Sequence, residues 1–158
     1  MRPLKICFAA VALAGFAGLI PFENEDISHL NPVEILCISR AESGVRIAAD
    51  GGIAARGNDL REALTRLSEA APGSLILQSV DQIVFTDCVP DAETLTDCGL
   101  RPAVRLYASP VQVENPDALA TYLSRHRRGT PLGAWNEKTA LPLLRVGESG
   151  LYLEEELP

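Results

Sequence analysis

The sequence predicts an α+β domain, in which a small mixed or antiparallel sheet carries about two packed helices and follows an N-terminal apolar helix. Three observations support this fold class. The 158 residues suit one domain. Hydrophobic residues make up 47% of the chain, which is enough for a packed core. Short apolar segments alternate with two amphipathic segments that carry helix-capping residues. We expect the helices to lie on one face of the sheet.

The predicted strands are short apolar segments bounded by glycine, proline or polar residues. Residues 33–39 and 45–50 flank a charged turn that ends in Gly44, and this arrangement predicts a hairpin. Further strands are expected at 74–78, 82–86 and 104–108.

Two helices are predicted from their start signals. Asp59 followed three residues later by Glu62 resembles a capping box, and apolar residues at helical spacing follow it. The second helix starts at Asn115, with Pro116 in its first helical position. We therefore expect helices over 59–71 and from 115 to about 128.

An uncharged apolar run over residues 6–22 follows Arg2 and Lys5, and acidic residues follow the run. This asymmetry is typical of an exported protein. The run could be a cleaved signal peptide or a retained membrane anchor, and the sequence leaves both open. The expected organisation is a signal peptide or anchor over 1–22, an α+β domain over 23–150 and a frayed acidic tail over 151–158.

The chain has a formal net charge of −7. This acidity argues against nucleic acid as the main partner, because a phosphate backbone requires a basic surface. Removal of residues 1–22 would take away two positive charges and no acid. We therefore expect an extracytoplasmic protein, secreted or membrane-anchored, that stays at a membrane through residues 6–22 or through a protein partner.

Residues with catalytic chemistry are few. His29 and His126 could act as bases, but a structural or surface role is favoured for each. Ser149 lies between glycines without the spacing of a nucleophile elbow. A small extracytoplasmic hydrolase that uses Ser149 or an acid pair is kept as an alternative function. The segment Asp50-Gly51-Gly52 is interpreted as a turn.

Charged clusters suggest one further alternative, a Ca²⁺- or ligand-binding module in the loop over residues 87–99. Carboxylate oxygens suit Ca²⁺, although the spacing favours a solvated loop. Three arginines at the end of the second helix could contact an acidic partner or a lipid head group, but stabilisation of the helix dipole is favoured. The carboxylates are Asp87, Asp91, Glu93 and Asp97, and the arginines are Arg125, Arg127 and Arg128.

The four cysteines predict no metal site, since no His pair or C-x-x-C spacing accompanies them. Cys7 lies in the apolar run, and Cys37 lies in a predicted strand as a packed thiol. Cys88 and Cys98 flank a polar loop and could form a disulfide worth about 2–3 kcal/mol. The sequence leaves this pairing open.

The order of elements is more informative than any single motif. A strand pair precedes the helix that begins Asp59-Leu60-Arg61-Glu62-Ala63-Leu64, and a strand ending Val84-Phe85-Thr86-Asp87 follows. Next come Leu100-Arg101-Pro102-Ala103-Val104-Arg105-Leu106-Tyr107 and a helix with Ala118-Leu119-Ala120-Thr121-Tyr122-Leu123. Over residues 30–128 this order resembles the N-terminal domain of Ger(x)C-type spore germination proteins.

The resemblance implies a non-catalytic, exported or membrane-tethered interaction protein linked to spore germination or sporulation in a Gram-positive bacterium. Its implied partners are membrane proteins similar to germinant-receptor subunits. No catalytic, cofactor or metal residues come with the family. Two features depart from it: no cysteine lies between Cys7 and Cys37 to carry a lipid, and the chain ends before the family's further domains. A stand-alone relative is therefore expected.

Overall fold

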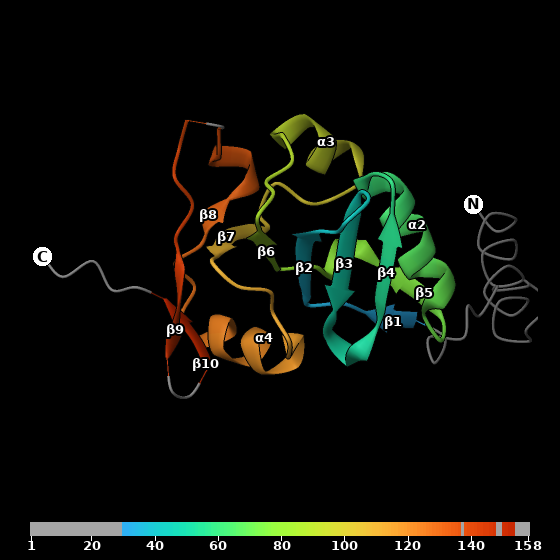
Figure 1. Ribbon diagram of the computed structural model, residues 1–158, viewed down its shortest axis with the longest axis horizontal. Coiled ribbons are helices and arrows are strands. Elements are labelled where there is room, and N and C mark those ends of the chain that lie inside the picture. Colours follow the sequence, from blue (N-terminus) through green and yellow to red (C-terminus); the bar gives the residue numbers. More distant parts are fainter. Residues whose placement is uncertain (1–29, 137, 148–149, 154–158) are drawn as a thin grey trace, which may run out of the picture.

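The computed structural model describes residues 30–136, 138–147 and 150–153, and within them the chain forms three α-helices and ten strands (Figure 1). The helices are α2 (Leu60–Ala70), α3 (Ala92–Asp97) and α4 (Pro116–Arg125). The strands are β1 (Leu30–Pro32), β2 (Ile35–Arg40), β3 (Val45–Ala49), β4 (Ala54–Gly57), β5 (Ser74–Ile76), β6 (Gln82–Thr86), β7 (Arg105–Ser109), β8 (Thr130–Pro131), β9 (Leu144–Gly147) and β10 (Gly150–Leu153). The α+β class predicted from the sequence is confirmed.

Six strands form the main sheet in the order β4-β3-β2-β6-β7-β8. The central pairs β2–β6 and β6–β7 are parallel, and the outer pairs are antiparallel. The sheet is therefore mixed. Strands β1 and β5 form a separate parallel pair, and β9 and β10 form a separate antiparallel hairpin.

The helices cover both faces of the main sheet, which corrects the expectation of a single covered face. The first core contains Leu36, Ile38 and Phe85 of the sheet and is closed by α2 and α3. The second core contains Ile35 and Val84, which point to the opposite face, and is closed by α4. Side chains alternate between faces along each strand, so two hydrophobic cores explain why β2 and β6 each contain an unbroken apolar run, over residues 35–38 and 83–85 respectively.

The predicted caps are present in the structure. The carboxylate of Asp59 accepts a hydrogen bond from the backbone N–H of Glu62 at 2.8 Å, and the side chain of Glu62 accepts one from the N–H of Asn58 at 2.8 Å. The side-chain oxygen of Asn115 accepts a hydrogen bond from the N–H of Ala118 at 3.1 Å. Gly44 closes the β2–β3 turn with φ +87°, a conformation that favours glycine.

Several elements differ from the prediction. Strands β1, β4 and β8 and the β9–β10 hairpin were not expected, and α3 lies within the segment interpreted as a loop. Strand β10 includes residues 151–153, which were assigned to the frayed tail. The N-terminal apolar run and residues 154–158 lie outside the described residues. No helix in the described part of the chain is long and apolar enough to cross a membrane.

Candidate functional site

The candidate bases and nucleophile are not brought together by the described structure. His29 and Ser149 lie outside the described residues. His126 is exposed at the end of α4, where its backbone N–H donates to the carbonyl of Leu123 at 3.1 Å. Its ring stacks on that of Tyr122 with 4.4 Å between centroids. A structural or surface role for His126 stays a prediction.

The acidic segment after β6 folds as α3. The carboxylate of Asp91 caps this helix by accepting hydrogen bonds from the backbone N–H and the hydroxyl of Thr94, at 2.7 and 2.9 Å. These bonds lower the pKa of Asp91 below its usual value. Within the described residues, no group of three or more His, Cys, Asp or Glu side chains is placed to hold a metal ion.

The segment Asp50-Gly51-Gly52 is a 3₁₀ turn that joins three parts of the domain. The carboxylate of Asp50 accepts hydrogen bonds from the backbone N–H groups of Glu34 and Ile35 at the start of β2, at 3.1 and 3.3 Å. The N–H of Gly51 donates to the carboxylate of Asp117 in the first turn of α4 at 2.9 Å. The segment therefore fixes α4 relative to the hairpin.

The three arginines at the end of α4 and just after it are exposed. The Nε–H of Arg127 donates to the carbonyl of Ser124 at 3.4 Å, and Arg125 lies in the last helical turn. Both positions agree with stabilisation of the carboxyl end of the helix.

The described cysteines are free thiols in the structure. Cys37 is buried in the second core, and this burial raises its pKa to about 12. Cys88 and Cys98 are half-buried and pack against the first core from the two ends of the α3 segment. Burial raises the pKa of both. The Cys88–Cys98 disulfide stays a prediction.

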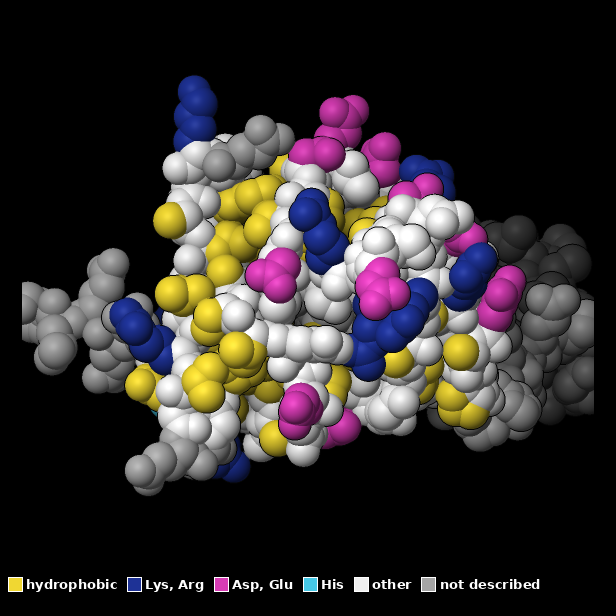
Figure 2. Space-filling model, viewed as in Figure 1, with side chains coloured by type: hydrophobic (Ala, Val, Ile, Leu, Met, Phe, Trp, Pro, Cys, Tyr) yellow, Lys and Arg dark blue, Asp and Glu magenta, His cyan; other side chains and the backbone are white. Residues whose placement is uncertain are grey.

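An apolar groove lies between α4 and the β9–β10 hairpin, and we name it the hairpin groove. Its volume is about 550 Å³. Figure 2 shows hydrophobic side chains gathered over this part of the molecule, to the left of the β3–β4 region. Its principal apolar lining residues are Val111, Leu119, Tyr122, Val146, Leu151 and Tyr152.

Two buried leucines attach the hairpin to α4. Leu144 and Leu153 are cross-strand partners at its base, and both belong to the second core. The N–H of Leu153 also donates to the hydroxyl of Tyr122 at 3.1 Å. Val146 and Leu151 are the next partners on the same face, so they continue the apolar face beyond the part that α4 covers.

The groove exposes side chains that would ordinarily be buried. Val146, Val111 and Tyr152 are exposed by 59%, 43% and 42%. They are three of the five large hydrophobic residues exposed in the described part of the chain, and a fourth, Leu143, directly precedes β9. Grouped exposed apolar residues mark interaction surfaces, whereas single ones are common on any protein.

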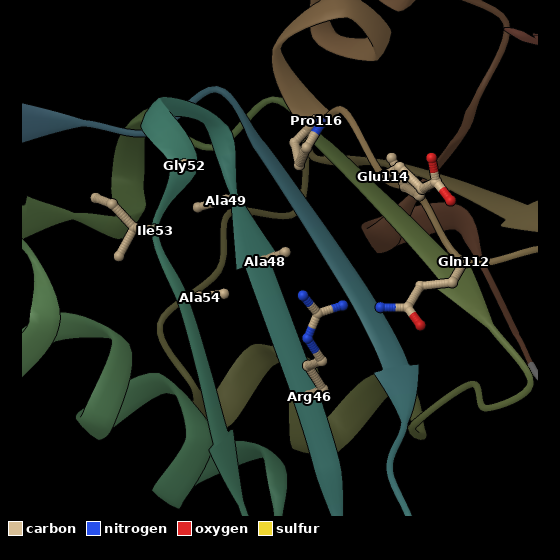
Figure 3. Close-up of a pocket in the computed structure, with 10 residues that line it drawn as sticks. Arg46, Ala48, Ala49, Gly52, Ile53, Ala54, Gln112, Glu114 and Pro116 are labelled. Atoms are coloured by element: carbon tan, nitrogen blue, oxygen red, sulfur yellow. The ribbon is translucent and has the colours of Figure 1, made fainter.

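A second cavity, of about 390 Å³, lies over the β3–β4 end of the sheet beside the start of α4 (Figure 3). We name it the arginine pocket. Arg46 and Gln112 point toward each other across it, while Ala48 and Ala54 present only methyl groups. Glu114 also lines it.

Sequence reasoning missed both cavities. The exposed residues of the hairpin groove come from the segment after β7, from β9 and from β10, and none of these segments carries a motif. Apolar residues alternate with other residues on both sides of a Gly-containing segment, at Leu144 and Val146 and again at Leu151 and Leu153, and this pattern is a sequence signal for a hairpin.

No family model, no curated protein and no solved structure matches this chain.

Proposed function

We propose that this chain is a non-catalytic interaction protein, exported or membrane-tethered, that binds a membrane-protein partner through the hairpin groove. The observation that carries the proposal is that the exposed residues Val111, Val146 and Tyr152 all line one groove, with Val146 on the face of the hairpin that continues the second core and Tyr152 on its other face. Burying these side chains against a partner would remove apolar surface from water, which is the main favourable contribution to protein association.

The groove has the composition of an interface centre. Valine, leucine and tyrosine line it together with the uncharged Gln112 and Asn115, and among the described lining residues Glu114 alone is charged. Depletion of charge and enrichment of aromatic residues characterise the centres of protein interfaces. Tyr152 also packs on its own hairpin, since a Cβ on Gly147 would come within 2.7 Å of a ring carbon of Tyr152. A packed tyrosine loses little conformational freedom on binding.

The sequence supports a partner at a membrane. Residues 6–22 form the uncharged apolar run, and basic residues precede it. The chain is acidic, with a net charge of −7, so charge alone would not hold the domain on an anionic membrane. A partner with apolar side chains flanked by basic ones complements both the groove and Glu114 at its side. The resemblance to the germination family makes a germinant-receptor-like subunit the first candidate.

The test is the recovery of membrane proteins by tagged full-length protein from sporulating cells of the source organism. Val146→Asp places a carboxylate in the groove, and its 59% exposure makes a folding defect unexpected. The matched control is Glu69→Gln, an exposed residue of α2. We expect Val146→Asp to lower recovery of one specific membrane protein at least fivefold, while the control retains it. Equal recovery by both variants would refute the proposal.

A further inference from the structure

A row of polar residues crosses the face of the sheet that α4 only partly covers. The register pairs Arg56 with Arg46, Arg46 with Ser39, Ser39 with Thr86, and Thr86 with Ser109. The row lies near the carboxyl ends of the parallel strands β2, β6 and β7. This edge of a sheet is where ligands commonly bind in α/β proteins.

Two arginines lie directly opposite each other at one end of the row. Like charges in this cross-strand position destabilise a sheet. Arg66 and Arg101 form ion pairs with Glu62 and Asp81, respectively. By contrast, Arg46 and Arg56 have no ion pair with any residue that the structure describes. The side chain of Arg46 is half-buried and lines the arginine pocket, where its positive charge forms no ion pair with a described residue.

The loop between β7 and α4 places a further polar group over the same spot. The hydroxyls of Thr86 and Ser109 both donate to the carbonyl of Val111, at 3.2 and 2.6 Å. Val113 is buried in the second core. Gln112 is thus held between two anchored residues, and its amide group faces the guanidinium of Arg46 (Figure 3).

The remaining walls suit a small molecule. Ala48 and Ala54 are cross-strand partners that leave space where larger side chains would fill it. Pro116, at the positively polarised start of α4, closes one side. The nearby carboxylates are directed elsewhere: Glu114 points away from Arg46 (Figure 3), Asp50 accepts the N–H groups of Glu34 and Ile35, and Asp117 accepts the N–H of Gly51. The cavity of about 390 Å³ lies within the range of ligand sites.

We propose that the arginine pocket binds a small organic anion, whose carboxylate or phosphate group is held by Arg46 and Gln112, with Arg56 on the neighbouring strand adding positive charge beside them. The short apolar part of this ligand would pack on Ala48 and Ala54. Guanidinium groups recognise planar carboxylates and phosphates through charge-assisted hydrogen bonds. An anion between the two arginines would also offset their mutual repulsion. This site does not depend on the proposed function of the hairpin groove.

The test is a titration of the ¹⁵N-labelled protein with citrate, and separately with inorganic phosphate, at constant ionic strength. NMR would follow the Arg46 Nε–H and the Gln112 side-chain amide. We expect saturable shifts at both groups with a Kd below about 5 mM for at least one anion, equivalent to a binding free energy of roughly −3 kcal/mol. The anion that produces saturable shifts shows whether the pocket recognises a carboxylate or a phosphate group.

Variants separate a specific site from general charge attraction. Arg46→Gln should weaken binding at least tenfold, Arg46→Lys should weaken it less, and Arg127→Gln, at an exposed arginine after α4, should leave it unchanged. Each variant's amide spectrum reports its fold. Linear shifts without saturation, or equal weakening by Arg46→Gln and Arg127→Gln, would overturn the proposal.

Discussion

Replacement of Gly57 by alanine tests how α2 is positioned against β4. A Cβ at this position would lie 2.3 Å from the backbone nitrogen of Ala63 and 2.8 Å from its Cα. These are backbone atoms of α2, so the helix must move away by roughly 1 Å to restore ordinary contact. Such overpacking costs about 1–3 kcal/mol.

Replacing glycine also has a stabilising effect on the free energy of unfolding, but this effect is smaller than the steric cost. Gly57 does not have a positive φ, so alanine fits its backbone, and the loss of unfolded-state freedom would stabilise the protein by about 0.4–1 kcal/mol. The steric cost should exceed this gain because backbone atoms cannot change rotamer. We therefore expect Gly57→Ala to lower the free energy of unfolding by about 1–2 kcal/mol.

Urea denaturation followed by circular dichroism measures this difference. The control is Gly133→Ala, where the nearest atom to the new Cβ is the side-chain Cβ of Pro102 at 3.0 Å. This contact is longer than the 2.3 Å contact at Gly57, so a much smaller displacement restores ordinary separation. The control should therefore change stability by less than half as much as Gly57→Ala. An unchanged or higher midpoint for Gly57→Ala would refute the reasoning.

Three further predictions concern the turn, the α3 cap and the thiols. Asp50→Ala removes the acceptor for the N–H groups of Glu34 and Ile35, so it should lower the free energy of unfolding in urea by about 1–3 kcal/mol. A loss of stability as small as that caused by Glu69→Gln would contradict the role of this carboxylate. The lowered pKa of Asp91 means that its stabilising effect is present above its unfolded pKa, near 3.8, and is lost as the pH falls through the lower folded value. Asp91→Asn should thus reduce the stability difference between pH 5 and pH 2, and an unchanged difference would argue against the cap. With its pKa near 12, Cys37 should resist iodoacetamide at pH 8 in the native protein, and mass spectrometry showing alkylation as fast as that of Cys88 or Cys98 would contradict its burial. The same mapping without reductant tests the Cys88–Cys98 disulfide.

The sequence was sufficient for elements that carry both an apolar pattern and a local signal. Helices α2 and α4 begin one residue after the predicted caps Asp59 and Asn115. Strand β6 has the predicted bounds because all five residues are buried. In each case local preference and tertiary packing favour the same structure.

The missed elements depend on partners distant in the sequence. Strand β4 reads Ala-Ala-Arg-Gly, which has no β-branched residue, and it forms because β3 pairs with it and Gly57 permits close approach of α2. Helix α3 is only six residues long and is stabilised by the buried Leu95. The placement of helices on both faces could not be predicted from helix periodicity alone, because that periodicity shows which side of a helix is apolar and not which sheet face it meets.

The candidate sites were hidden for the same reason. The arginine pocket brings together Arg46 from β3 and Gln112 from the loop after β7, and only the strand register shows that Arg46 faces Arg56. The hairpin groove requires the β9–β10 register and the hydrogen bond from Leu153 to Tyr122. Neither feature follows from composition.

Site-specific photo-cross-linking in living cells is the most direct test of partner binding through the hairpin groove. A photoreactive amino acid would be placed at Val146 in one strain and at the exposed Glu69 of α2 in another. Our account predicts a covalent adduct with one membrane protein from position 146 and none from position 69. An adduct from position 69 with no adduct from position 146 would contradict it.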